Sequence, residues 1–345
     1  MLSRAKATRV QNFRLPIVAY LQACCLAIFY SPAIAKTISL SFPLQCELHK
    51  TCFIQNYVDT DPSSGAKDYQ CGQMTYDGHK GTDFRVVSVS DAKNGVHVIA
   101  AAPGRVKAIR DGMKDRLVDG DTNSLRGREC GNGVVIDHGQ GWETQYCHLR
   151  QGSIRTQQGQ QIKRGEAIGF LGYSGKTQFA HLHLSVRLRG REIDPFTGQE
   201  GSDGRCGGGA PKGLWQEGNK QPLSYRRGEL IEIGFADRPV GTRDLEEGKG
   251  GQVSAHSGSI VFYARFINLE GGDTLQLVLS GPSGVLARNK TKSLERNKAQ
   301  FVAYAGRRLR SDRWPSGRYR GQVQLLRSGR IILDQEAVLD IQRPN

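Results

Sequence analysis

The chain has 345 residues, of which 48 are lysine or arginine and 33 are aspartate or glutamate, so its formal net charge is +15. This length can hold two domains, each with its own core. No segment after residue 35 is long and apolar enough to span a bilayer, and the chain has no aromatic-plus-basic module or recognition-helix pattern, which argues against a helical membrane domain and against nucleic acid as a partner.

Residues 1–35 have the pattern of a signal peptide for export. Four basic residues and no acidic ones precede the mostly apolar stretch Leu15–Tyr30, and Ala33-Ile34-Ala35 fits the small-x-small rule for cleavage. An uncleaved membrane anchor is the alternative, but the apolar stretch is short and contains Gln22. We therefore expect a periplasmic or secreted protein with no transmembrane span in the mature chain. Its net charge would be +11, because the signal carries four of the basic residues.

Six cysteines follow the predicted signal. An even number in an exported chain suggests disulfide bonds, but six cysteines allow about 15 pairings and the sequence does not choose among them. All six precede residue 207, so we expect the disulfides in the first of two domains. The residues are Cys46, Cys52, Cys71, Cys130, Cys147 and Cys206.

Residues 36–200 read as short strands between glycine-rich turns. Residues 95–112 predict two strands around a Pro-Gly turn, and residues 132–149 predict a hairpin around a Gly-Gln-Gly turn. Residues 113–129 are polar and charged, so we interpret them as an exposed insertion loop. Because no long apolar pattern with a period of 3.6 residues is present, this domain is expected to be rich in β-structure.

The stretch FAHLHLSVRL, residues 179–188, alternates polar and apolar side chains. This period of two is typical of a strand with one face in the core, and it places His181 and His183 together on the opposite face. Two imidazoles on one surface can be half of a metal site. They can equally belong to an ordinary half-buried strand, and this stretch alone leaves both interpretations open.

Two further motifs bring more candidate residues. DGHKGTDFRV, residues 77–86, places His79 and Asp83 around a glycine, and QYCHL ends a predicted strand with His148. Zinc hydrolysis needs two or three nitrogen or oxygen ligands, an open position for water, and groups that move protons and stabilise an oxyanion. One carboxylate and two imidazoles would keep the charge of the site near +1 and the bound water acidic. Two further histidines would fill the proton-transfer roles.

The order H-x-x-x-D, Y-x-H-L and H-x-H resembles the lysostaphin-type (LytM-type) M23 zinc endopeptidases, which cut peptidoglycan cross-bridges. The resemblance covers about residues 79–195 and includes HKGTDF, AAPGRVKAI, GNGVVIDHGQGWETQYCHL, GQQIKRGEAIGFLGYSG, HLHLSV and DPF. It implies an all-β fold with an M23-type antiparallel sheet in residues 36–200, and Zn²⁺ as cofactor. By position, it implies that His79, Asp83 and His183 hold the zinc. His148 and His181 would flank the bound water, one as general base and both as stabilisers of the oxyanion.

The sequence departs from the family pattern without losing any of these five residues. Members often have Pro before H-x-H and Phe-Glu after it, whereas this chain has Ala180 and Leu184-Ser185. A glycine commonly precedes the histidine of Y-x-H-L, where this chain has Cys147, and we expect Cys147 to pair with Cys130. These departures bear on substrate preference and on the shape of the groove.

Three other polar residues of this region are expected to lie outside the chemistry. Asn132 occupies a position where some latent members place a metal-blocking side chain, and we expect it to be structural or at the substrate rim. His138 opens a hairpin turn and is interpreted as structural. Tyr146 is expected in the core or in the wall of the groove.

Residues 201–222 predict a glycine-rich linker, with Cys206 able to tie it back to the first domain. Beyond it, residues 223–345 predict a small immunoglobulin-like (Ig-like) β-sandwich. Its expected strands are residues 229–236, 259–267, 274–281, 300–306, 317–326 and 331–341. Residues 214–345 carry 21 basic and 14 acidic residues, or +7, which suits an envelope protein partner or an anionic polymer and equally serves solubility.

Together these features predict an exported zinc metalloendopeptidase that hydrolyses amide bonds in the stem peptides or cross-bridges of peptidoglycan. One alternative is a non-catalytic LytM-type regulator or cell-wall-binding protein on the same fold. Another is a zinc hydrolase that acts on proteins or small peptides. The sequence does not indicate which peptidoglycan bond is cut.

Overall fold

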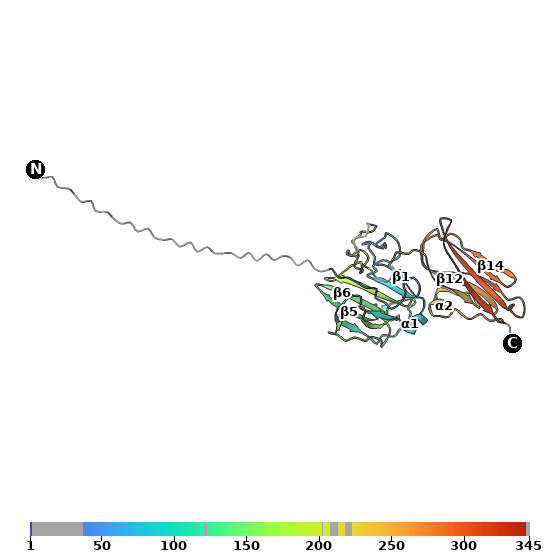
Figure 1. The fold of residues 1–345 in the computed structure, drawn as a ribbon, viewed down its shortest axis with the longest axis horizontal. Helices are drawn as coiled ribbons and strands as arrows, with labels where there is room; N and C mark the ends of the chain where they lie inside the picture. The colour runs from blue at the N-terminus through green and yellow to red at the C-terminus, as the bar shows by residue number, and fades with distance from the viewer. Residues whose placement is uncertain (2–36, 121–122, 202, 208–212, 218–222, 343–345) are drawn as a thin grey trace. The chain divides into compact units, whose positions relative to one another are not determined.

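The computed structural model describes residue 1 and residues 37–120, 123–201, 203–207, 213–217 and 223–342. The predicted signal peptide and part of the predicted linker therefore lie outside the described residues. The described residues from Thr37 onward group into one compact unit (Figure 1). Among them, no helix is both long and apolar enough to cross a membrane.

The first part of this unit is built on an eight-stranded antiparallel sheet. Its strand order is β1-β2-β9-β6-β5-β4-β7, with β10 paired to β9. The predicted hairpin of residues 132–149 is confirmed as the β5–β6 pair. The strands are β1 (Cys52–Asn56), β2 (Thr82–Val86), β4 (Gly104–Arg110), β5 (Asn132–Gly139), β6 (Trp142–Leu149), β7 (Gln161–Ile162), β9 (His181–Leu188) and β10 (Arg191–Glu192).

The remaining elements of this part are short. β3 (His97–Ile99) pairs with β8 (Ala167–Phe170), so the two strands predicted in residues 95–112 are present but belong to different sheets. The helix α1 (Val89–Gly95) begins at Ser88, whose side chain caps it. The predicted insertion loop has one 3₁₀ turn, η1 (Asn123–Leu125), among its described residues.

The later part of the unit consists of two antiparallel sheets around a shared apolar core. One sheet has the order β11-β12-β15 and the other the order β14-β13-β16-β17. Apolar side chains from both sheets meet in one buried cluster, so the predicted β-sandwich is confirmed. The elements are β11 (Glu229–Ala236), α2 (Thr242–Glu246), β12 (Ser259–Leu269), β13 (Thr274–Gly281), β14 (Gly284–Lys290), β15 (Lys298–Arg308), β16 (Gly317–Arg327) and β17 (Arg330–Ile341).

Three disulfide bonds pair all six of the cysteines that follow the predicted signal. They are Cys46–Cys52, Cys71–Cys206 and Cys130–Cys147. The pairing of Cys147 with Cys130 is the one expected from the sequence, across the mouth of the predicted hairpin, and Cys206 does tie the linker segment back to the first part of the unit. β10 is the last strand of the eight-stranded sheet and β11 is the first strand of the later sheets. The exact domain boundaries stay a prediction.

Candidate metal centre and active site

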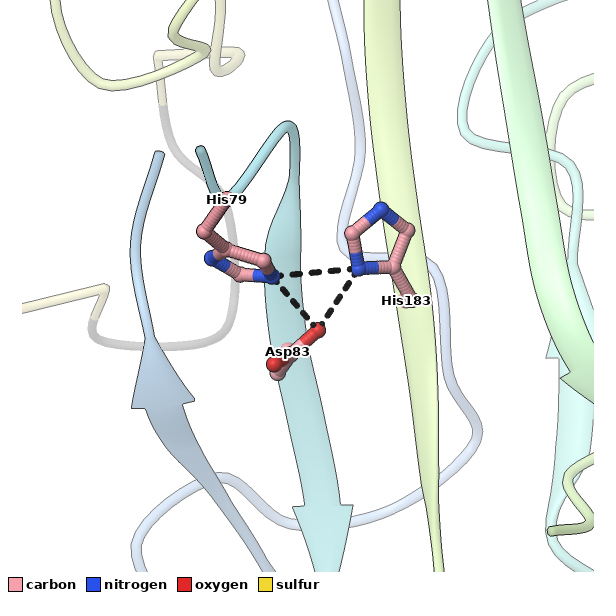
Figure 2. Close-up of side chains that lie close together, drawn as sticks. All are labelled: His79, Asp83 and His183. Atoms are coloured by element: carbon pink, nitrogen blue, oxygen red, sulfur yellow. Dashed lines mark hydrogen bonds and ion pairs between the residues drawn. The ribbon is translucent and has the colours of Figure 1, made fainter. Parts of the chain in front are cut away.

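The three predicted ligands lie together at the junction of β2 and β9 (Figure 2). Asp83 is directly opposite His183 in the antiparallel register of these strands, and His79 reaches the same point from the loop before β2. His79 Nε2 lies 3.2 Å from Asp83 Oδ1 and 3.1 Å from His183 Nδ1. His183 Nδ1 lies 2.8 Å from the same Asp83 oxygen. These three side chains form a group that could hold a metal ion.

A glycine between the ligands makes their approach possible. A Cβ atom at Gly81 would lie 2.6 Å from His183 Nε2 and 2.7 Å from the carbonyl oxygen of Leu184. Such contacts are far shorter than van der Waals distance, so a side chain at this position would push β9 away from the loop. The glycine in HKGTDF is therefore a structural requirement of the site.

In His79 and Asp83, one polar atom points away from the centre and is hydrogen-bonded to a neighbouring group. The other polar atom, here called the inner atom, faces the other ligands. His79 Nδ1 donates to the carbonyl oxygen of Tyr57 at 2.6 Å, so its lone pair is on Nε2. Asp83 Oδ2 accepts a hydrogen bond from Asn56 Nδ2 at 2.8 Å, which leaves Oδ1 for the centre. Backbone and side-chain partners of this kind commonly orient metal ligands.

The spacing and chemistry of the inner atoms fit a zinc ion. Ligands bound at about 2.0–2.1 Å in a tetrahedron are separated by about 3.3 Å. The three inner atoms here are 2.8–3.2 Å apart. Two imidazole nitrogens and one carboxylate oxygen are also a donor set that zinc accepts, with a fourth position left for water.

The electrostatics of the centre favour a carboxylate surrounded by imidazoles. Burial opposes ionisation of Asp83, but the charges of His79 and His181 hold its pKa well below the usual value. Burial lowers the pKa of His183 despite its hydrogen bond to Asp83. For His79 burial also acts downward, yet the charge and hydrogen bond of Asp83 outweigh it and raise the pKa. The Asp83 carboxylate is therefore held in its ionised form among the imidazole rings, as a metal ligand must be.

His148 lies beside the three ligands with an unusual backbone conformation. Its φ is 63°, in the left-handed region, and its N–H donates to the carbonyl oxygen of Cys130 at 2.8 Å. Its Nδ1 donates to the carbonyl oxygen of Ser174 at 2.7 Å, so the lone pair is on Nε2. Burial, followed by the charges of His181 and His183, holds the pKa of His148 well below its usual value. This imidazole is therefore neutral near pH 7.

His181 is the neighbour of His148, with 4.5 Å between the ring centroids. Its Nδ1 donates to the carbonyl oxygen of Phe179 at 2.9 Å, and Thr177 Oγ1 lies 3.0 Å away. Its Nε2 points toward the centre, 3.5 Å from Asp83 Oδ1. All five residues predicted from the sequence are thus close together. Four are buried, and the His183 side chain is 16% exposed.

The other polar residues considered from the sequence lie outside this group. His138 binds the carbonyl oxygen of Pro103 and the Thr144 hydroxyl. The Asn132 amide donates to the carbonyl oxygens of Met113 and Leu149 and accepts from the N–H of Met113, so it braces the insertion loop.

Sequence reasoning missed the partners that orient the site. Asn56 is the last residue of β1, and no motif in the sequence marks it. Tyr57, Ser174 and Phe179 act through carbonyl oxygens, which every residue type has. Tyr76, whose ring centroid lies 4.4 Å from that of His79, was also missed, although an aromatic residue so close to the HKGTDF motif was a signal.

The region of the chain that matches known proteins contains all five of the residues predicted for this site. Residues 77–195 match the model of peptidase family M23. An uncharacterized metalloprotease of Haemophilus influenzae is 30% identical over 119 residues, which are 34% of this chain and 20% of that protein. The peptidoglycan DD-endopeptidase ShyA of Vibrio cholerae is 41% identical over 64 residues, or 19% of this chain and 14% of that protein.

One further relative and one solved structure are also similar to part of this chain. The DD-carboxypeptidase/endopeptidase Mpg of Neisseria meningitidis is 40% identical over 67 residues, which are 19% of this chain and 15% of that protein. The crystal structure of a zinc-containing peptidase from Vibrio cholerae is 23% identical, covers 46% of this chain and 39% of that one, and has a TM-score of 0.31. This chain thus spans about a fifth or less of the curated relatives it matches.

Proposed function

We propose that this chain, whose residues 77–195 match the model of peptidase family M23, is an exported zinc metalloendopeptidase that hydrolyses amide bonds in peptidoglycan stem peptides or cross-bridges. The observation that carries the proposal is the convergence of His79, Asp83 and His183 within 3.2 Å of one another. The names of relatives that are peptidoglycan DD-endopeptidases support the substrate class.

In this proposal the chain's own residues divide the chemistry. His79 Nε2, Asp83 Oδ1 and His183 Nδ1 would hold the zinc ion, which when bound polarises the scissile carbonyl and makes water more acidic. Nδ1 of His148 and of His181 each donates to a backbone carbonyl, so in the neutral form of either ring Nε2 is the nitrogen that can accept a proton. One of them takes the proton of the attacking water and passes it to the leaving amine. While it carries this proton, its Nε2–H stabilises the negative charge that develops on the carbonyl oxygen.

The proposed location and partners rest on the rest of the chain. Three disulfide bonds suit an oxidising compartment outside the cytoplasm, in line with the predicted signal peptide. The β-sandwich adds an excess of basic residues, which supports contact with an anionic envelope polymer or an envelope protein.

The test is digestion of purified sacculi by the purified protein, with the soluble products read by mass spectrometry. We expect about one zinc ion per chain and release of muropeptides with one hydrolysed amide bond, whose identity names the bond. Sacculi that stay intact with a zinc-loaded protein would favour the non-catalytic regulator. Cleavage of casein or small peptides without cleavage of sacculi would favour the protein hydrolase.

A further inference from the structure

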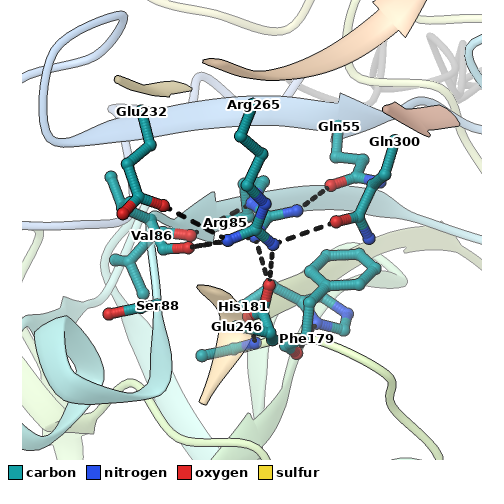
Figure 3. Close-up of polar contacts among 12 residues, drawn as sticks. Gln55, Arg85, Val86, Ser88, Phe179, His181, Glu232, Glu246, Arg265 and Gln300 are labelled. Carbon is teal, nitrogen blue, oxygen red and sulfur yellow. Dashed lines mark hydrogen bonds and ion pairs between the residues drawn. The ribbon is translucent and has the colours of Figure 1, made fainter. Parts of the chain in front are cut away.

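Three buried charged side chains and the partly exposed Glu232, from distant parts of the sequence, form a cluster next to the proposed site (Figure 3). Glu246 Oε2, at the end of α2, accepts hydrogen bonds from Arg85 Nη2 on β2 at 2.6 Å and from Arg265 Nη2 on β12. Arg265 Nη1 lies 3.8 Å from Glu232 Oε2 on β11. The two positive and two negative charges cancel, as burial of so many ions requires.

The second oxygen of the Glu246 carboxylate holds the backbone of the histidine strand. Oε1 accepts a hydrogen bond from the N–H of Ala180 at 3.0 Å, one residue before His181. The carbonyl oxygen of Ala180 accepts from the N–H of Val86 at 3.2 Å, so both polar groups of this residue are fixed. Proline, which many M23 sequences have at this position, lacks an N–H and could not make the contact.

Glu246 also supports His181 through Arg85. The Arg85 guanidinium lies over the Phe179 ring at 4.8 Å, and the Phe179 ring stacks on the His181 ring at 4.3 Å between centroids. The carbonyl oxygen of Phe179 is in turn the acceptor for His181 Nδ1. The Glu246 carboxylate therefore contacts both the Ala180 N–H and Arg85. Through these two groups it helps to set the position and the tautomer of the His181 imidazole.

We propose that Glu246 is a positioning residue for His181. By holding residues 179–181 against β2, it keeps Nδ1 of the imidazole on the Phe179 carbonyl and Nε2 toward the metal centre. The inference rests on the proposed function, since it assumes that His181 acts on the substrate. It makes a helix outside the M23 match, at residues 242–246, a working part of the active site.

The competing explanation is that the cluster only joins the two parts of the compact unit. Buried ion pairs can often be replaced by apolar residues with little loss of stability, so a stability measurement alone does not separate the two explanations. A positioning role predicts an effect on turnover at constant zinc content and constant folding. A purely structural role predicts an effect on stability without one on turnover.

The first variant is Glu246→Gln, which keeps the size of the side chain and removes its charge. We expect kcat to fall by about 10- to 100-fold, the size of effect expected when a reacting group is displaced by about 1 Å. KM and zinc content should stay within twofold of wild type. The matched control is Asn268→Gly, which removes the 3.1 Å hydrogen bond of Asn268 Nδ2 to the Gln55 carbonyl, another contact between the two parts, and should leave kcat unchanged.

A second variant guards against loss of folding. Glu246→Leu combined with Arg265→Met leaves Arg85 and Glu232 as one positive and one negative charge, so the cluster remains neutral. Arg85 keeps its hydrogen bonds to Gln55 Oε1 and to the carbonyl oxygens of Val86 and Val87, which hold its guanidinium in place. The Ala180 N–H would nevertheless lose its acceptor, and we expect kcat to fall as in the first variant. Wild-type kcat in this folded double variant would overturn the proposal.

The state of the His181 ring supplies a readout that does not depend on activity. Long-range ¹H–¹⁵N NMR spectra of histidine-labelled protein should show a single tautomer with a proton on Nδ1, assigned by its absence in His181→Gln. In Glu246→Gln the two ring nitrogens should move toward averaged shifts. If the wild type never cleaves peptidoglycan but this response is seen, the proposed function fails and the positioning role stands. An unchanged ring in both Glu246 variants refutes the positioning role whatever the activity.

Discussion

At the residue scale, the hydrogen bond made by one ring nitrogen of each key histidine determines whether the other nitrogen has a lone pair for a metal ion or a proton. His79, His148 and His181 all donate from Nδ1 to a backbone carbonyl. In its neutral form each ring therefore has its lone pair on Nε2, which faces the centre, and none can change tautomer without breaking a buried hydrogen bond. His183 is arranged in the opposite way, with Nδ1 toward Asp83 and Nε2 3.1 Å from Ser185 Oγ.

The first prediction separates metal ligands from proton-transfer groups. His183→Ala removes one of three ligands, so both zinc and activity should be lost. His148→Ala should retain about one zinc per chain and lower kcat by about 10²- to 10⁴-fold, the usual contribution of a general acid–base group. Zinc is measured by mass spectrometry of the metal, and kcat by release of soluble muropeptides.

The control for this pair is His138→Ala, since the ring of His138 binds Pro103 and Thr144 and lies outside the candidate site. It should keep both zinc and activity. A His148→Ala protein that is fully active, or that arrives without zinc, would contradict the assignment of His148 to proton transfer.

The candidate site could be predicted from the sequence because its five residues stand in short motifs with a fixed order. What could not be predicted is how each one is oriented. The acceptors for His79 and His148 are the carbonyl oxygens of Tyr57 and Ser174, and a carbonyl group is present whatever the side chain. Only folding decides which carbonyl comes within reach.

At the scale of the element, the longer strands of the later part were predicted except β14, and neither helix was predicted. α1 has seven residues and α2 has five, too few to show a period of 3.6. β14, at the edge of its sheet, has no fully buried residue, so GVLARNK carries little apolar signal. Glu246 illustrates the consequence, because DLEEG resembles a solvated turn and its burial follows only from the contacts of α2.

The second prediction concerns the disulfide that joins the chain just before β5 to the end of β6. Cys147 precedes His148, and the carbonyl oxygen of Cys130 binds the His148 N–H. Replacing both cysteines by alanine should lower the free energy of unfolding by about 3 kcal/mol, the value for a closed loop of this length. It should also lower kcat about tenfold, since the left-handed backbone of His148 loses a support.

The matched control is the removal of Cys46–Cys52, whose partners are 6 residues apart compared with 17 for Cys130–Cys147. This change should cost about 2 kcal/mol of unfolding free energy and leave kcat unaltered. Stability is measured by denaturant unfolding and zinc content is checked in both variants. Equal effects on kcat would show that the Cys130–Cys147 bond does not support His148 specifically.

At the scale of the whole molecule, buried polar contacts join the M23-like sheet to the two later sheets. Besides the cluster around Glu246, His49 Nδ1 lies 2.6 Å from Glu229 Oε1 at the start of β11. Asn268 of β12 donates to the carbonyl oxygen of Gln55. These contacts are directional, so each is satisfied in only one register of the two parts. The composition change near residue 201 indicated two parts, whereas no local pattern indicated how they are joined.

The last prediction concerns the stability of the whole molecule as a function of pH. Asp194, in the DPF motif, is buried, and its Oδ1 accepts from the N–H of Phe196 at 2.7 Å. Its Oδ2 has no hydrogen-bond partner among the described residues. Burial, helped by the charges of Asp68 and Asp203, outweighs the hydrogen bond and raises the pKa of this carboxyl from 3.8 to about 7.

Because the folded pKa is the higher one, the folded protein keeps a proton between about pH 4 and pH 7 that the unfolded chain releases. Asp194 therefore supports folding below about pH 4, and this contribution is lost as the pH rises to about 7. At about 1.4 kcal/mol for each pH unit between about pH 4 and pH 7, the contribution lost from the free energy of unfolding is about 4 kcal/mol. Asp194→Asn keeps the acceptor for Phe196 and cannot ionise, so denaturant unfolding at fixed zinc from pH 4.5 to 8 should show its free energy of unfolding rising relative to wild type across this window. Parallel curves for the two proteins would mean that Asp194 is ionised in the fold and finds a partner for its charge.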